Sequence, residues 1–466
     1  MEQKKTYSIG TLTYTMPKLL FVSFWVLGSL LTLNLLAYKM VPTIMPLLFD
    51  RHNVSAATMA IISSSIPYVI NIIICPLIST LSDKTRTRWG RRIPYLAIST
   101  PFVVGIMITI AFEPDIASFI QRNWAPNADL NYIGTWVLAV LVILFQLAYL
   151  VPGSVVYYVY ADVIPKQFIG RFMAVSSFLG TGITFVFNYY VLAPAVDQPK
   201  IWFPIIGGVY FLSYLMLCIF VKEGEYPPVD DNIDKNSGIC KRVTEHIALY
   251  FRECYSFPIY TWLFITTGVT QASTLCRGMF NLLFATKDLK MSNQEYGNAM
   301  AIGAVIAAII VLPMGKLMDK LHPIYIFMVS GFIIIAMNLW GYFFVNDART
   351  FTVVGIAIVV IYAIQSLSSG PLLLYLVPRE QYGQFASANS LINCAIMFFA
   401  SMLGGYCTDL FGYRMIFIWD FILTITATVT LFIVLKEWKK LGGKNYVPPR
   451  YQDKFAAVPN TGDMKK

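Results

Sequence analysis

Apolar residues come in long runs that are separated by short polar intervals. An α-helix needs about 20 apolar residues to cross the hydrocarbon layer of a membrane, and twelve such runs can be drawn along the chain. They cover residues 19–40, 57–81, 94–112, 132–160, 172–193, 202–221, 259–284, 297–315, 323–345, 351–377, 385–407 and 415–435. The pattern predicts an all-α membrane protein with twelve transmembrane helices.

Composition agrees with this class, and charge sets an orientation. Of the 466 residues, 57% are hydrophobic and 13% are charged, against about 25% charged in soluble domains. With both termini in the cytoplasm, tails and cytoplasmic loops hold 26 of the 35 Lys and Arg residues, as the positive-inside rule prefers. We expect a multi-pass, monomeric protein of the plasma membrane or bacterial inner membrane. Its net charge of +10 then faces lipid, and nucleic acid is not an expected partner.

Residues with catalytic or metal-binding chemistry are scattered. The three histidines, His52, His246 and His322, fall in predicted loops, and no nucleophile lies beside a base. Five of the seven cysteines lie in apolar runs, which gives no disulfide framework. The sequence therefore predicts neither an enzyme nor a bound metal or cofactor.

The two halves of the chain echo each other. Residues 163–177, VIPKQFIGRFMAVSS, align with residues 376–390, LVPREQYGQFASANS, and LSDK (81–84) aligns with LMDK (317–320). The long polar interval after the sixth run separates the copies. We predict a six-helix bundle at 1–221, a cytoplasmic linker at 222–258, a second bundle at 259–436 and a cytoplasmic tail at 437–466. Paired six-helix repeats are typical of carriers that bind substrate at the membrane midplane.

The polar loop after the second run carries a motif. It reads SDKTRTRWGRRIP, from Ser82 to Pro94, and resembles the major facilitator superfamily. More narrowly, it resembles the sucrose:proton symporters and the glycoside-pentoside-hexuronide cation symporters, as does ADVIPKQFIGR at 161–171. The resemblance implies a secondary active transporter that works by alternating access. The second run holds no acidic residue, so we expect H⁺ as the coupling ion and Na⁺ less so.

This loop is interpreted as a gating element at the cytoplasmic face. A carboxylate at the end of the second helix can stabilise the N-terminus of a neighbouring helix, and the arginines can pair with a carboxylate at the end of the fourth. The alternative is that the cations only obey the positive-inside rule. The gating residues are Asp83, Arg88, Gly90, Arg91, Arg92 and Asp162, with Asp319 as the weaker copy in the second half.

Polar side chains inside four of the runs are candidates for the substrate cavity. The resemblance places that cavity between the first, fourth, seventh and tenth helices. Polar groups within a membrane are costly and usually face a cavity, although helix–helix hydrogen bonds are the alternative for each residue singly. The candidates are Asn34, Tyr38, Lys39, Gln146, Tyr149, Gln271, Thr274, Arg277, Asn281, Tyr362 and Gln365.

The positions of two cations within the runs bear on whether the substrate is neutral or anionic. Arg277 lies about 10 Å inside the predicted end of its helix, so we expect the cavity or the substrate to compensate its charge. Lys39 either faces the cavity or extends its side chain to the outer headgroups. The sequence predicts a proton-coupled sugar or glycoside symporter, with Asp162 as the coupling carboxylate. An anionic sugar such as a uronide, or another organic acid, is the alternative if both cations face the cavity. A non-transporting sensor on the same fold is the alternative of another class.

Overall fold

The computed structural model describes residues 6–9, 11–224, 250–378 and 381–450. Most of the predicted linker, Arg379 and the end of the predicted tail lie outside these residues. The first half contains β1 (Thr6–Ile9), β2 (Leu12–Thr15), α1 (Met16–Leu33), η1 (Asn34–Met40), α2 (Val41–Arg51), α3 (Ala56–Ala60), η2 (Ile61–Ser65), α4 (Ile66–Lys84), α5 (Ile93–Ala111), α6 (Glu113–Trp124), α7 (Leu130–Val163), α8 (Lys166–Val186), η3 (Phe187–Val191), α9 (Leu192–Asp197) and α10 (Pro199–Phe220). The second half contains α12 (Pro258–Leu283), η4 (Phe284–Asp288), α13 (Asn293–Lys320), α14 (Pro323–Phe344), α15 (Ala348–Leu376), α16 (Tyr382–Phe411), α17 (Met415–Lys440) and the short η6 (Gly443–Asn445).

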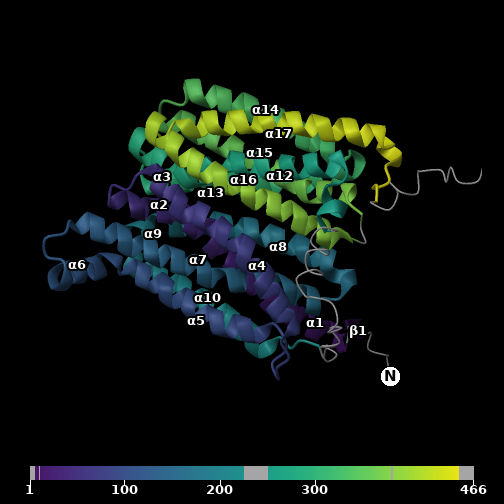
Figure 1. Cartoon of the computed structure of the whole chain (residues 1–466), viewed down its shortest axis with the longest axis horizontal. Helices are drawn as coiled ribbons and strands as arrows, with labels where there is room; N and C mark the ends of the chain where they lie inside the picture. The colour runs from purple at the N-terminus through teal and green to yellow at the C-terminus, as the bar shows by residue number, and fades with distance from the viewer. Residues whose placement is uncertain (1–5, 10, 225–249, 379–380, 451–466) are drawn as a thin grey trace, which may run out of the picture.

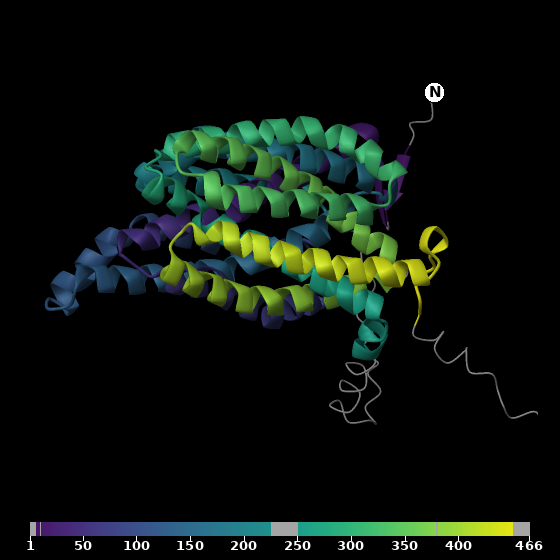
Figure 2. The same cartoon turned by 90° about the horizontal axis from the view of Figure 1, so that it is seen from above.

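The helices of both halves run along the long axis of the molecule, and the halves form two layers (Figure 1). Hairpin β1–β2 and the end of α17 lie at one end, which we call the terminal end (Figure 2). Helix α6 lies at the opposite end, which we call the far end (Figure 1). Large apolar side chains such as Ile98, Phe102 and Phe399 remain more than 60% exposed on the described surface, as expected where lipid is the solvent.

The predicted membrane helices are present. Eleven helical segments in the described chain are long and apolar enough to span a membrane. The remaining predicted span is α12, whose 26 residues include Gln271, Thr274 and Arg277. It is long enough to cross but less apolar, and it packs extensively against α16 and α17. Its polar residues are therefore held inside the protein.

Three segments differ from the sequence prediction. The first span covers Met16–Arg51, not 19–40, because the apolar pattern continues to Phe49 and the helix accommodates Pro42 and Pro46. The predicted loop 113–131 contains the amphipathic helix α6. The polar N-terminal tail forms a hairpin in which Tyr7 pairs with Tyr14, and Tyr14 is buried.

Turns of π-helix interrupt several long helices. The turn η1 joins α1 to α2, η2 joins α3 to α4, and η3 joins α8 to α9. Each π-turn inserts an extra residue and rotates the following helix, and such turns are frequent at functional sites. Residues Val41 and Pro42, which follow η1 directly, line the central cavity described below.

Candidate functional site

A cavity lined by both polar and apolar side chains lies between the two halves near the middle of the helices. It has a volume of about 550 Å³. The first half contributes Tyr68, Asn71, Gln146 and Tyr149, and the second half contributes Gln271 and Thr274. The cavity is therefore built by both halves at once, and any relative movement of the halves changes its shape.

A second cavity of about 350 Å³ adjoins the first and shares Gln271 and Thr274 with it. Helix α15 contributes Tyr362, Gln365, Ser366 and Ser369, and α16 contributes Asn389. Its lining residues on α15 extend from the middle of the helix at Tyr362 to Leu373, three residues before the helix ends at the terminal end. The combined cavity thus reaches from the middle of the protein toward the terminal end.

All lining residues of both cavities within the described chain are uncharged. Amides, hydroxyls and tyrosine rings supply donors, acceptors and flat apolar faces. These groups suit a solute that carries many hydroxyls on an apolar ring. A fixed ionic charge on the solute would find no opposite charge among these lining residues.

Arg277 does not line either cavity, which corrects the expectation that the cavity or the substrate compensates its charge. Its Nε lies 3.3 Å from Oδ2 of Asp420 on α17. Its Nη2 donates to Oδ1 of Asn338 at 2.5 Å, and its guanidinium lies over the ring of Phe417, 5.0 Å from the centroid. A carboxylate on another helix compensates the buried cation, and sequence spacing along α12 could not reveal it.

Asp420 is the centre of this buried cluster and is 0% exposed. Its Oδ2 accepts from Nδ2 of Asn338 at 2.8 Å and from the hydroxyl of Tyr362, while its Oδ1 accepts from Thr424 at 3.1 Å. Tyr362 also lines the smaller cavity. Tyr362 therefore contacts the buried ion pair through its hydroxyl and also borders the smaller cavity.

The basic loop between α4 and α5 binds the end of α7. Arg91 donates through Nη2 to both carboxylate oxygens of Asp162 at 2.9 Å, and Arg92 donates through Nε to the same carboxylate at 3.0 Å. Arg92 also contacts Ser82 at 2.8 Å and lies over the ring of Tyr158. The expected contact between the arginines and Asp162 is present; a gating role stays a prediction.

Glu223, just after α10, also binds this loop, and the sequence interpretation missed it. Its carboxylate accepts from the backbone N–H groups of Arg91, Arg92 and Ile93 at 2.8 to 3.0 Å. The first N–H groups of a helix lack partners inside the helix, and α5 has Arg92 at its cap position without a capping side chain. The available signal was a helix that begins without a capping side chain, together with a carboxylate just after the end of the sixth span, on the same side of the membrane.

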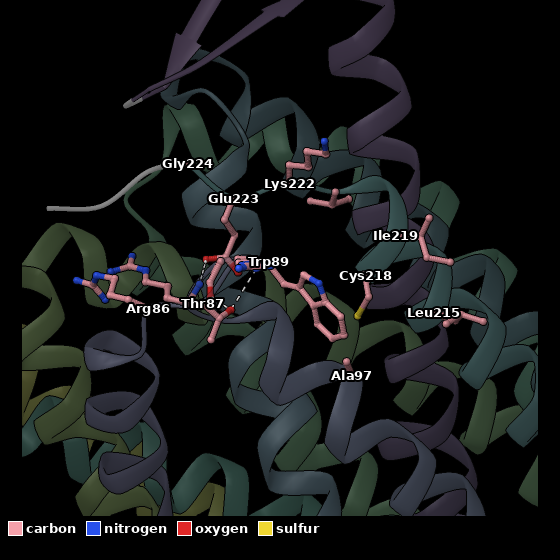
Figure 3. A pocket seen from close by; sticks show the side chains of 14 residues that line it. Arg86, Thr87, Trp89, Ala97, Leu215, Cys218, Ile219, Lys222, Glu223 and Gly224 are labelled. Atoms are coloured by element: carbon pink, nitrogen blue, oxygen red, sulfur yellow. Dashed lines mark hydrogen bonds between the residues drawn. The ribbon is translucent and has the colours of Figure 1, made fainter. Parts of the chain in front are cut away.

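Gly90 makes this arrangement possible. Its φ is +110°, a conformation that L side chains rarely adopt, and a side-chain carbon there would lie 2.7 Å from the carboxyl carbon of Glu223. A cleft of about 900 Å³ lies between the loop and the end of α10. Figure 3 shows the indole of Trp89 directed into this cleft toward Cys218, with Glu223 beside the loop backbone.

At the far end, the two halves are joined by side chains that cross between them. The carboxylate of Asp409 on α16 accepts from the backbone N–H groups of Ala56 and Ala57, at 2.6 and 2.9 Å. It therefore caps α3 of the other half. Gly405, one turn earlier, allows close contact, since a side-chain carbon there would lie 2.7 Å from the carbonyl oxygen of Ala56.

Further contacts support this junction. Ser65 bonds Ser401 at 2.6 Å, and Lys287 forms an ion pair with Asp50. These pairs also join the first half to the second, so the structure is closed at its far end.

Comparison with known proteins identifies this architecture. Residues 263–457 match the family model of the Major Facilitator Superfamily. A bacterial homologue of the human lysosomal transporter Spinster, in an inward-facing and unoccupied conformation, superposes with a TM-score of 0.67 at 14% identity, over 92% of this chain and 99% of that one. The chain has the major facilitator fold. No curated protein matches it in sequence.

Other solved structures with the major facilitator fold differ in their substrates. A nucleoside transporter superposes with a TM-score of 0.56 at 12% identity, over 90% of this chain and 99% of that one. A D-xylose-proton symporter gives a TM-score of 0.59 at 12% identity, over 93% of this chain and 99% of that one. At these identities the comparison shows the fold and leaves the substrate to be argued from the cavity.

Within the major facilitator fold, the predicted site residues separate into groups. Gln146, Tyr149, Gln271, Thr274, Tyr362 and Gln365 line the two cavities. Asn281 does not: its side chain is buried against the hydroxyl of Tyr296 at 3.3 Å. Asn34 donates to the carbonyl of Leu30, one turn earlier in the same span, and is not among the residues that line the two cavities. For Asn281 a helix–helix hydrogen bond was the better interpretation, and a cavity role for Asn34 stays a prediction.

Several predicted residues remain without a test. The side chains of Tyr38, Asp83 and Asp319 lie outside the described residues. Arg88 is exposed on the loop. Lys39 is partly buried on η1, three residues before Pro42, and no carboxylate pairs with it among the described side chains.

The major facilitator fold also brings in cavity residues that the sequence interpretation left out. Tyr68 and Asn71 come from the second span, and Asn389 comes from the eleventh. Asn389 accepts a hydrogen bond from Thr267 at 2.6 Å. Polarity within an apolar run was the available signal, but the resemblance places the cavity between four of the twelve helices, and these three residues lie on others.

Proposed function

We propose that the protein is a secondary active transporter that moves a neutral sugar or glycoside across the membrane by alternating access, and that protons drive its uptake. The observation that carries this proposal is the uncharged cavity shared by both halves, in which amides and hydroxyls stand beside apolar side chains. A ring solute with several hydroxyls can use the amides of Gln146 and Gln271 together, one from each half. Binding energy at such a shared site changes when the halves move.

The conformation fits a carrier that is open on one side. The far end is closed by Asp409 and its neighbours, and the cavity reaches toward the terminal end. If both termini are cytoplasmic, as the basic residues predict, this is an inward-facing state. The loop held by Arg91, Arg92 and Asp162 lies at the end that must close in the opposite state.

The pairing of Arg277 makes a neutral substrate the first candidate and an anionic one the second. The anionic alternative is favoured if both Arg277 and Lys39 face the cavity, and Arg277 is paired with Asp420. Lys39 keeps a uronide as the second candidate, because it lies one helical turn from the cavity residue Pro42 and has no carboxylate partner within the described chain.

Thermal unfolding of the purified protein against neutral sugars, glycosides and hexuronates tests the substrate class. A ligand that binds only the folded state raises the unfolding temperature with saturation. We expect stabilisation by a neutral glycoside or sugar. Stabilisation by hexuronates alone, abolished by Lys39→Gln, would replace the neutral class with the anionic one.

Uptake into proteoliposomes tests transport itself. We expect the stabilising sugar to accumulate when the lumen is made alkaline, and Gln146→Leu and Gln271→Leu to lose uptake. Gln121→Leu is a matched control, because Gln121 lies on α6 and bonds the carbonyl of Ala128 outside the cavity. Binding without flux in wild-type protein would instead favour the sensor.

A further inference from the structure

We propose that Asp420 is the proton-binding site of the transporter and that Tyr362 transmits its protonation state to the substrate cavity. The inference rests on the proposed function, because it needs a carrier whose substrate binds beside Tyr362. It replaces Asp162, the carboxylate that the sequence suggested, with one that is connected to the cavity. Asp162 accepts three hydrogen bonds from Arg91 and Arg92, which fits a structural role at the helix end.

The position of Asp420 is unusual for an acid. It is the one carboxylate among the described residues that lies more than a turn inside a spanning helix, five residues after Met415 begins α17. Acidic side chains at such depth are costly and mark ion pathways in membrane proteins. Its pairing with Arg277 explains how the buried charge is tolerated. Pairing alone does not explain why the pair lies next to a cavity residue, Tyr362.

Charged and titratable groups reach Asp420 from several helices. From α12 come Arg277 and the thiol of Cys276, which interacts electrostatically with both Asp420 and Cys407 of α16. Helix α15 supplies Tyr362, α14 supplies the neutral Asn338, and α17 itself supplies Thr424. Of these groups, Tyr362 also lines a cavity.

The hydrogen bond between Tyr362 and Asp420 gives a route for the proton. The Tyr362 hydroxyl now donates to Oδ2 of Asp420. A hydronium ion that reaches the cavity from the acidic side can give a proton to the Tyr362 oxygen while the proton of Tyr362 passes to Oδ2. The hydronium becomes a neutral water, Asp420 has gained one proton, and Tyr362 is again a neutral phenol.

The transfer reverses the direction of this hydrogen bond. Protonated Asp420 donates to the Tyr362 oxygen, and the Tyr362 proton points into the cavity, where a sugar oxygen can accept it. Arg277 loses its counter-charge but keeps Oδ1 of Asn338 at 2.5 Å and the ring of Phe417. The buried cation thus retains two partners in the protonated state.

Proton binding at Asp420 and sugar binding beside Tyr362 must therefore affect each other equally. If a proton on Asp420 makes Tyr362 a donor for the sugar, then bound sugar must raise the proton affinity of Asp420 by the same factor. Proton and sugar therefore bind together, which is what a symporter requires.

Infrared difference spectroscopy of the full-length protein in lipid tests the proton site without a substrate. On acidification we expect a carboxylic acid C=O band that is present in wild type and absent in Asp420→Asn. Persistence of the same band in the variant would overturn the assignment. Because Asp420→Asn leaves Arg277 unpaired and can unfold, the double variant Arg277→Gln with Asp420→Asn is measured beside it, and the band must be absent there too.

The same band tests the link to the cavity. Methyl β-D-glucoside is the first probe, followed by the neutral glycoside that stabilises the protein most. In wild type we expect added glycoside to increase the band at fixed pH, and in Tyr362→Phe to leave it unchanged. Tyr296→Phe is the matched control, since Tyr296 is a buried tyrosine that bonds Asn281 and not Asp420, and it should respond as wild type does. An equal response in Tyr362→Phe would overturn the inference.

Transport measurements separate this inference from the proposed function. With Asp420→Asn, whose amide can donate to Tyr362 as the protonated acid does, we expect glycoside exchange to continue and accumulation under a pH gradient to be lost. Accumulation by this variant would overturn the inference while leaving the carrier intact. If wild type binds no glycoside, the proposed function fails, and the acidification spectrum alone decides the proton site.

Discussion

Two arginine–aspartate clusters use the same chemistry in different surroundings. At the terminal end of the first half, Asp162 binds Arg91 and Arg92, and its side chain is 17% exposed. In the second half, Asp420 binds Arg277 and is 0% exposed. A partly exposed cluster can separate and be hydrated when a helix end moves. A fully buried cluster cannot separate without leaving a charge in a low-dielectric interior, which costs several kcal/mol.

The comparison assigns different tasks to the two clusters. The partly exposed cluster joins three segments, namely the loop between α4 and α5, the end of α7, and Glu223 just after α10. Its ion pairs can therefore break and form again when the helix ends move. The buried cluster joins α12, α14, α15 and α17 and is suited to holding the helices of the second half together.

The largest effect is expected from breaking the buried pair. Asp420→Ala leaves Arg277 uncompensated, which should lower the free energy of unfolding by about 3 to 5 kcal/mol. The measurement is thermal unfolding in detergent at neutral pH. Replacing both members, by Arg277→Met with Asp420→Leu, should recover most of the loss. A double variant as unstable as Asp420→Ala would mean that packing, not charge, is what Asp420 supplies.

Substitutions in the partly exposed cluster should lower the transport rate more than the free energy of unfolding. With Arg91→Ala we expect transport to fall at least tenfold, about 1.4 kcal/mol in the barrier, while sugar affinity stays within a few fold. Uptake and thermal-shift titration measure the two quantities. Because Arg91 and Asp162 act in one network, adding Asp162→Asn should cost little more. Full transport by both single variants would leave the positive-inside rule as a sufficient explanation of the loop.

The cap between the halves should shift the conformational equilibrium. Asp409→Asn replaces a charged acceptor at the N-terminus of α3, where such an interaction is worth about 0.5 to 2 kcal/mol. We expect the far end to open more often. Thiol labelling of Cys407, two residues before Asp409, reports the opening, with Cys407→Ser as the unlabelled control. Unchanged labelling would mean that the remaining contacts close this end without Asp409.

The cap within the first half should act more weakly on stability. Glu223→Gln removes the charge but keeps an acceptor for Arg91, Arg92 and Ile93, so we expect a loss of about 0.5 to 1 kcal/mol in unfolding free energy. Thermal unfolding measures it. Gly90→Ala should cost more than Glu223→Gln, because it adds backbone strain as well as contact with Glu223. The reverse order would show that the capping charge outweighs loop geometry.

The smallest effect is expected at a surface pair. Lys440 and Glu437 lie three residues apart at the end of α17, with Lys440 57% exposed. Glu437→Gln should change the unfolding free energy by less than about 0.5 kcal/mol, since exposed pairs are hydrated in both states. It serves as the reference against which the two clusters are compared. A loss as large as that of Asp420→Ala would contradict the importance of burial.

The sequence by itself determined the elements that depend on local pattern. Apolar runs longer than a membrane crossing predicted the spanning helices, because lipid does not solvate an unpaired backbone. The orientation that the basic loops predict stays a prediction. Repeated segments predicted two halves. The motif from Ser82 to Pro94 also indicated the loop whose arginines reach Asp162, since both partners lie at helix ends on one side of the membrane.

Only the tertiary structure decided which polar residues meet. Arg277 and Asp420 are 143 positions apart, and Asp409 caps a helix 352 positions earlier, so no spacing along one helix could pair them. The same helix, α12, presents Gln271 to the cavity and turns Arg277 toward α17. Which face of a helix a neighbour covers is fixed by packing between helices, and that packing decides whether a buried polar group binds a partner or a substrate.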